Sequence, residues 1–64
     1  MTAKKAISDL QILVIDDNQQ TVRLLSMMLR DMGVKKVLTA QDSLSGWDIL
    51  VAAGKGAIDG IICD

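Results

Sequence analysis

Residues 11–17 read QILVIDD, in which four consecutive aliphatic side chains, Ile12 to Ile15, are followed at once by Asp16 and Asp17. An apolar run without alternation is typical of a strand covered on both faces, as in parallel sheets. Charge directly after such a run is unusual, and functional carboxylates often occupy this position. The stretch predicts a buried parallel strand with a candidate site at its carboxyl end.

A helix is predicted directly after this strand. Between Asn18 and Met32, apolar residues recur at helical spacing and polar residues occupy the other side. The side-chain oxygen of Asn18 can accept hydrogen bonds from free amides of the first turn, and Gly33 suits a left-handed residue after the last turn. The predicted helix, residues 18–32, is therefore marked at both ends.

The rest of the chain repeats this order of a strand followed by a helix. A short strand is predicted near 37–39, and Asp42 or Ser43 can cap a second helix, which Gly46 weakens by up to ~1 kcal/mol relative to alanine. After the loop AGKG, a third strand is predicted over 58–63, where Gly60 marks a bulge or a close approach. The predicted apolar face of the second helix consists of Leu44, Trp47, Leu50 and Val51.

The spacing of these elements predicts their arrangement. Equivalent strand positions lie about 25 residues apart, which fits a repeating strand–helix unit and a parallel sheet. Strand–helix–strand crossovers are right-handed in ~98% of cases, and covering both faces then requires the sheet order 2-1-3. Ligands of such open sheets bind beyond the carboxyl ends of the strands, where the winding reverses.

Three aspartates are expected to meet at this reversal point. Asp16 and Asp17 follow the first strand, Asp64 follows the third, and neighbouring strands are ~4.8 Å apart. Carboxylates in one pocket raise at least one pKa unless a cation neutralises them. Mg²⁺ suits such an oxygen site, and Mn²⁺ fits it as well. A carboxylate beside the metal can attack phosphorus, so the residues suggest phosphoryl chemistry.

The composition of the chain argues against some classes of binding partner and location. The 64 residues carry a formal net charge of −1, which gives no general field for nucleic acid or an anionic membrane. No stretch approaches the ~20 apolar residues of a membrane span, and no secretory signal opens the chain. The lone cysteine, Cys63, cannot form an internal disulfide, so we expect a cytoplasmic protein.

Four stretches in order, ILVIDDN, VRLLSMMLRDMGV, TAQDSLSGWDIL and IDGIICD, resemble the amino-terminal half of the receiver domain of two-component response regulators. The likeness covers residues 11–64 and is strongest to the single-domain chemotaxis type. It implies the βαβαβ half of a flavodoxin-like, doubly wound parallel sheet. Such sheets are known to have the order 2-1-3-4-5, so the resemblance and the handedness argument give the same expectation.

The resemblance also implies roles for the acidic residues. Asp64 would accept phosphate from a sensor histidine kinase or a phosphotransfer protein, and Asp16 and Asp17 would hold Mg²⁺ directly or through water. Residues 1–64 are then expected to be a truncated, inactive receiver whose first ten residues are partly flexible. The sequence departs from the family pattern at three positions, Ser43, Trp47 and Gly60. These differences are expected to change the geometry around those residues.

Two other functions are open. A half domain exposes apolar surface and a strand edge, which favours a non-catalytic module that self-associates, with a homodimer through the sheet edge as one arrangement. A Mg²⁺-dependent phosphohydrolase with its nucleophile at the end of the first strand is weaker, because the two acids there are adjacent rather than two positions apart.

Several apolar residues are expected to be structural. Cys63 is expected to be a small buried side chain on the third strand, and Trp47 to lie in the core. The methionines of the first helix are expected to fill the core rather than to form a recognition surface; they are Met27, Met28 and Met32.

Overall fold

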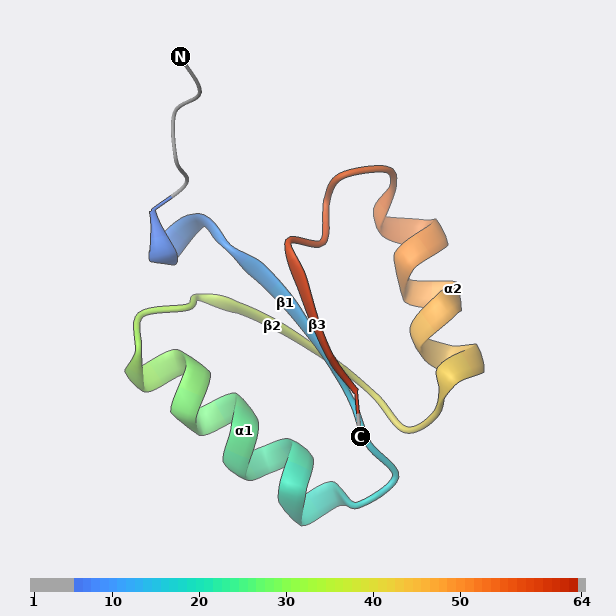
Figure 1. Cartoon of the computed structure of the whole chain (residues 1–64), viewed down its shortest axis with the longest axis horizontal. Coiled ribbons are helices and arrows are strands. Elements are labelled where there is room, and N and C mark those ends of the chain that lie inside the picture. The colour runs from blue at the N-terminus through green and yellow to red at the C-terminus, as the bar shows by residue number, and fades with distance from the viewer. Residues whose placement is uncertain (1–5, 64) are drawn as a thin grey trace.

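The computed structural model describes residues 6–63, which form a three-stranded sheet between two helices (Figure 1). The elements alternate along the chain after one short 3₁₀ turn, η1. Their bounds are η1 Ile7–Asp9, β1 Gln11–Ile15, α1 Gln19–Asp31, β2 Lys36–Ala40, α2 Ser43–Ala53 and β3 Gly60–Cys63.

All strand pairs are parallel, and the sheet order is β2-β1-β3. Ile15, the last residue of β1, pairs with Ala40 on one side and with Cys63 on the other. The carboxyl ends of the three strands therefore lie in one row. The predicted order 2-1-3 is confirmed.

The helices cover opposite faces of the sheet: α1 lies on one side, α2 on the other, and both contact β1 and β2 (Figure 1). This is the arrangement of half of a flavodoxin-like doubly wound fold, as the sequence predicts. β1 carries most of the burial because it has a strand on each side and a helix on each face.

Both predicted ends of α1 are confirmed. The Asn18 side chain accepts hydrogen bonds from the amides of Gln20 at 2.9 Å and Thr21 at 3.2 Å. At the other end Gly33 has φ 108°, and the amides of Gly33 and Val34 donate to carbonyls of the last turn. This paired geometry is the Schellman motif, which glycine permits at least cost.

The core is small and centred on β1. Leu13 and Val14 are fully buried, and successive strand residues face opposite sides of the sheet. Leu13 and Ile15 pack with Ala40 and with half-buried side chains that include Ile49 and Leu50 of α2. Val14 thus lies on the face that α1 covers.

Gly46 of α2 is buried at the contact between helix and sheet. A Cβ atom at this position would lie 2.5 Å from Cδ1 of Ile15 and 3.9 Å from Cβ of Ala40. The glycine, predicted only as a weak point of the helix, lets α2 approach β1 closely.

β3 begins at Gly60, two residues later than predicted. Before it, Asp59 donates its amide to the Gln11 carbonyl and accepts the Gln11 amide on Oδ2, both at 2.9 Å. The register with β1 then runs without a bulge. A Cβ at Gly60 would lie 3.1 Å from Cδ1 of Ile12, so the close approach, and not a bulge, explains this glycine.

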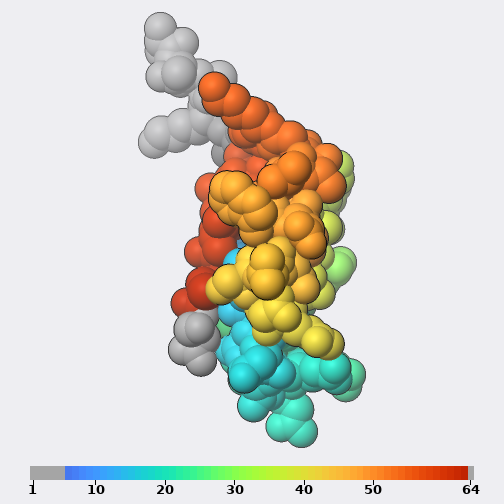
Figure 2. Space-filling view, turned by 90° about the vertical axis from the view of Figure 1, so that its right-hand side faces the viewer, coloured from blue at the N-terminus to red at the C-terminus, as the bar shows by residue number. Residues whose placement is uncertain are grey.

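Three expectations about burial are wrong. Trp47 is 64% exposed on the outer side of α2, the methionines of α1 are exposed, and so is Cys63. Each of these side chains lies on a surface that no described element covers. Figure 2 shows this for β3, the strand of Cys63, which lies beside α2 and is not covered by that helix. No helix among residues 6–63 is long and apolar enough to cross a membrane.

Candidate functional site

Asp16 lies at the carboxyl end of β1, where the sequence predicts a site. Its amide donates to the Ala40 carbonyl at 3.1 Å, which extends the ladder between β1 and β2 by one bond. Its side chain is 8% exposed, and Oδ1 accepts the Asn18 amide at 2.9 Å. A buried carboxylate is thus held in a defined position directly before α1.

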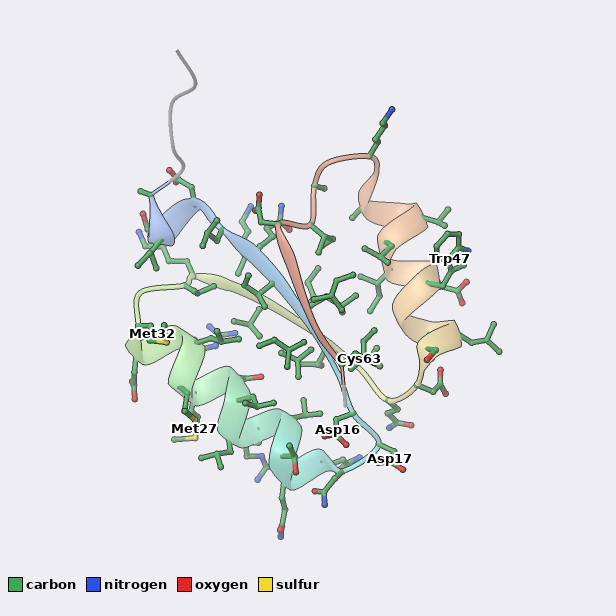
Figure 3. All side chains as sticks on the ribbon, viewed as in Figure 1. Asp16, Asp17, Met27, Met32, Trp47 and Cys63 are labelled. Atoms are coloured by element: carbon green, nitrogen blue, oxygen red, sulfur yellow. The ribbon has the colours of Figure 1, made fainter. Side chains whose placement is uncertain are left out.

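Asp17, the next residue, differs from Asp16 in its exposure. It is exposed, and its side chain projects outward from the loop between β1 and α1 (Figure 3). β1 ends at Ile15 and the chain bends at Asp17, so the two adjacent acids have different environments. Of the two adjacent acids, Asp16 is the one that the fold builds into the site.

Asp64, the third predicted member, lies outside the described residues. Within residues 6–63 no group of three or more Asp, Glu, His or Cys side chains is placed to hold a metal ion. The predicted set includes Asp64, so the three-carboxylate site stays a prediction. The described neighbour of Asp64 is Cys63, which pairs with Ile15.

Two hollows border Asp16. The larger, of about 430 Å³, opens between the beginnings of the two helices and the end of β2. Besides Asp16, its lining includes Arg23 of α1, Gln41 after β2 and Ser45 of α2. The polar lining and a buried carboxylate suit a small hydrated or cationic group rather than an apolar ligand.

The smaller hollow, of about 330 Å³, lies on the side of β3. It is lined by Ile15, Asp16, Thr21, Leu25, Ile62 and Cys63. This hollow joins the carboxyl ends of β1 and β3, the place where the winding of the sheet reverses. It is the part of the structure that corresponds to the predicted meeting point of the acids.

The helix beginnings around the larger hollow are already capped. Asn18 accepts from two first-turn amides of α1, as described above, and Asp42 of the α2 cap accepts the Ser45 amide at 2.7 Å. Hydrogen bonds from the Ser45 amide and then from the Ser45 hydroxyl lower the pKa of Asp42. Asn18 therefore already engages part of the positive potential that the beginning of a helix carries.

Some lining residues are absent from the sequence prediction. Arg23 is exposed and borders the larger hollow, whereas Val22 and Leu25 are half-buried. Gln41 and Ser45 were not identified, although Gln41 directly follows β2. The rule that singled out Asp16, a polar residue at the carboxyl end of a strand, applies equally to Gln41.

Comparison with models of known protein families, with curated proteins and with solved structures finds no match to this chain.

Proposed function

We propose that this chain supplies the acidic half of a phosphoacceptor site of the receiver type. In this proposal Asp64 accepts the phosphoryl group, and Asp16 holds Mg²⁺, or Mn²⁺ in its place, while the exposed Asp17 contributes through water. The observation that supports it most is the pairing of Ile15 with Cys63, because the residues that follow these two partners in the sequence are Asp16 and Asp64. Carboxyl ends at a reversal of winding are where open α/β sheets bind ligands.

The donor set fits a hard divalent cation. Mg²⁺ and Mn²⁺ prefer carboxylate oxygens and water, and the side chains in question are all aspartates. In Asp16 the Asn18 amide is bonded to Oδ1, so this hydrogen bond fixes the carboxylate without engaging Oδ2. A bound cation would offset negative charge on the phosphoryl oxygens.

The proposed reaction transfers a phosphoryl group from the phosphohistidine of a sensor histidine kinase or phosphotransfer protein. A carboxylate oxygen of Asp64 forms the new bond to phosphorus, and the bond from phosphorus to the donor imidazole nitrogen breaks. The imidazole leaves with the electron pair and takes up a proton. Asp16 would contribute a buried carboxylate of fixed position to the cation. The exposed thiol of Cys63 suits a reducing compartment such as the cytoplasm.

Metal binding is tested with Mn²⁺, whose unpaired electrons broaden nearby amide resonances. We expect selective broadening at Asp16, Asp17 and Cys63, and its loss in Asp16→Asn. Asp48→Asn, which removes an exposed carboxylate from α2, is the matched control and should leave the broadening unchanged. Broadening that is spread evenly over all aspartates, or that survives Asp16→Asn, would contradict the proposed metal site.

Phosphoryl acceptance is tested by incubating the chain with Mg²⁺ and either acetyl phosphate or a beryllofluoride reagent. We expect an adduct on the wild type and none on Asp64→Asn, because Asp64 is the proposed acceptor. Intact-mass and amide-shift measurements detect it. Equal adduct levels in the two proteins would show that Asp64 is not the acceptor.

A second candidate function is a non-catalytic module that self-associates. The observation that favours it is the number of large apolar side chains that remain exposed on α1, α2 and β3. Exposed apolar surface of this extent commonly marks an interaction site. The two candidates are compatible, since the exposed apolar side chains of α1 and α2 lie outside the hollows that border Asp16.

A further inference from the structure

The segment between β1 and α1 has one residue, Asn18, at the centre of its hydrogen bonds. The Asn18 amide donates to Oδ1 of Asp16 at 2.9 Å. Its side-chain oxygen accepts the amides of Gln20 and Thr21, and its carbonyl accepts the Val22 amide at 3.0 Å. Asn18 is exposed, yet its amide, its carbonyl and its side-chain oxygen are all bonded.

These bonds form two linked turns of the same kind. In each turn a side-chain oxygen accepts the amide two residues further along, first from Asp16 to Asn18 and then from Asn18 to Gln20. The first turn holds a carboxylate, and the second holds the beginning of a helix. The backbone of Asn18, at φ −90° and ψ 109°, is common to both turns, so a change in one turn must affect the other.

The carboxylate of Asp16 has no other described partner. Its backbone is bonded to the Ala40 carbonyl, but among residues 6–63 only the Asn18 amide bonds its side chain. In the same part of the chain no fully buried side-chain oxygen lacks a hydrogen bond. Oδ2 of Asp16 is therefore accessible, and the two hollows that border Asp16 are where it can be reached.

We propose that Asn18 is a positioning residue for the acidic site and acts through its cap on α1. The cap holds Asn18 in extended backbone just outside the helix. In this conformation its amide reaches Oδ1 of Asp16 and leaves Oδ2 open to the hollows. Without the side-chain oxygen, the backbone of residue 18 is no longer held, and the carboxylate loses its partner for part of the time.

The number of available rotamers sets the size of the expected effect. A carboxylate held by a hydrogen bond occupies one staggered χ1 rotamer, whereas a released one distributes over up to three. The apparent dissociation constant of a ligand rises in proportion as the fraction of the competent conformer falls. Release of Asp16 should therefore raise the dissociation constant for Mg²⁺ by up to about threefold. This effect on metal rests on the proposed function, whereas the effect on the rotamer does not.

The rotamer is measured in the metal-free protein. Three-bond couplings between the α and β protons of Asp16 show whether χ1 is fixed or averaged. We expect a single rotamer in the wild type and averaged couplings in Asn18→Ala. Asn18→Ser keeps a side-chain oxygen that can cap the helix, so it should retain the wild-type couplings. A fixed Asp16 in Asn18→Ala would overturn the inference, whether or not the chain binds a metal.

Two matched variants separate positioning from helix stability. Asp42→Ala removes the corresponding cap of α2, which accepts the Ser45 amide, and should leave the couplings of Asp16 unchanged. Asn18→Gly removes the side-chain oxygen but is tolerated at a helix beginning much better than alanine, so it should release Asp16 with little loss of stability. Circular dichroism confirms that each variant is folded. Release of Asp16 in Asp42→Ala, or its retention in Asn18→Gly, would show that Asn18 does not act through its side-chain oxygen.

A titration with Mg²⁺, followed by the amide shifts of Asp16 and Cys63, connects the rotamer to the proposed function. We expect Asn18→Gly to raise the dissociation constant by about two- to threefold, and Asn18→Ser and Asp42→Ala to leave it unchanged. Equal dissociation constants in Asn18→Gly and the wild type would reject a role of Asn18 in metal binding. If the wild type binds no Mg²⁺ at Asp16, the proposed metal site is wrong, and the couplings alone decide whether Asn18 positions Asp16.

Discussion

At the scale of single residues, Gly46 shows how a residue that is poor for a helix can be required by packing. Alanine there would gain up to about 1 kcal/mol of helix propensity, but its Cβ would lie 2.5 Å from Cδ1 of Ile15, which is buried and branched at Cβ. Overpacking of this kind typically costs about 1–3 kcal/mol. We expect Gly46→Ala to lower the free energy of unfolding by about 1 kcal/mol, measured by urea denaturation.

The same contact provides the control. Ile15→Val removes Cδ1, the nearer of the two Ile15 atoms that the new methyl group would meet; the other, Cγ1, would lie at 3.1 Å. In the Ile15→Val background, Gly46→Ala should therefore cost less than in the wild type, and the double-mutant cycle should report a coupling. An equal loss of stability in both backgrounds would mean that the contact with Ile15 is not the cause.

Asp42 gives a pH dependence at the same scale. Hydrogen bonds from Ser45 lower its pKa below the ordinary value of 3.8, so the charged cap favours the folded state above that value. This stabilisation is lost as the pH falls through the lowered pKa of the folded state. Asp42→Asn keeps a cap acceptor that does not titrate. Circular dichroism below pH 3.8 should show a loss of stability in the wild type that the variant lacks, and parallel curves would exclude Asp42 as the cause.

At the scale of elements, Asp59 fixes the beginning of β3 through its two hydrogen bonds with Gln11. Asp59→Ala removes the side-chain acceptor of the Gln11 amide, and Asp59→Asn retains an oxygen in its place. We expect faster amide hydrogen exchange at Gln11 and along β3 in the alanine variant, and exchange close to wild type in the asparagine variant. Similar acceleration in both variants would point to the charge of Asp59 rather than to its acceptor.

The element order, the sheet order and both ends of α1 were predictable from the sequence. These features depend on local chemistry, such as the cap at Asn18 and the positive φ at Gly33, and on the general handedness of crossovers. The beginning of β3 was predicted less well. Hydropathy extends the strand back to Ile58, but Asp59 uses its side chain to pair with Gln11 before the regular ladder begins.

The side of α2 that faces the sheet was not predictable from periodicity. Both sides of this helix carry apolar residues, and the close approach at Gly46 decides that Ile49 and Leu50 pack inward while Trp47 remains outside. The predicted burial of Cys63 was wrong for a related reason, because β3 is an edge strand and Cys63 is exposed on it. An apolar pattern tells which residues favour burial, but not whether the described fold supplies something to cover them.

The candidate site was predictable in part. The position of Asp16 follows from its place after a buried strand, and the structure adds its burial and its bond to the Asn18 amide. The exposure of Asp17 goes with the bend that follows β1, and the adjacency of two aspartates in the sequence does not reveal it. The contributions of Gln41 and Ser45 depend on how β2 and α2 meet, which only the assembled fold reveals.

At the scale of the whole molecule, stability depends on a small core centred on one strand. Leu13 is fully buried, whereas Ile61, its register partner on β3, is half exposed. A chain of this length has a total stability of only a few kcal/mol to about 10 kcal/mol. We expect Leu13→Ala to cost about 2–5 kcal/mol and to leave much of the protein unfolded in water.

Ile61→Ala is the matched comparison for this prediction. It should cost less than about 1 kcal/mol, since the side chain has little to lose in contacts. Urea denaturation of the two variants measures both values. Comparable losses would mean that β3 shares the core equally with β1, contrary to the burial described above.

The central place of β1 has a consequence for how the chain folds during synthesis. Of the three described strands, β1 is the first to be synthesised, yet both of its hydrogen-bonding edges need partners that are made later. The partner of Ile15 in β3 is Cys63, 48 residues further along, so at ~5–20 residues per second this edge waits about 2–10 s for its strand. During that interval the most apolar segment of the protein is open on one side, and a nascent chain is most exposed to aggregation before β3 is complete.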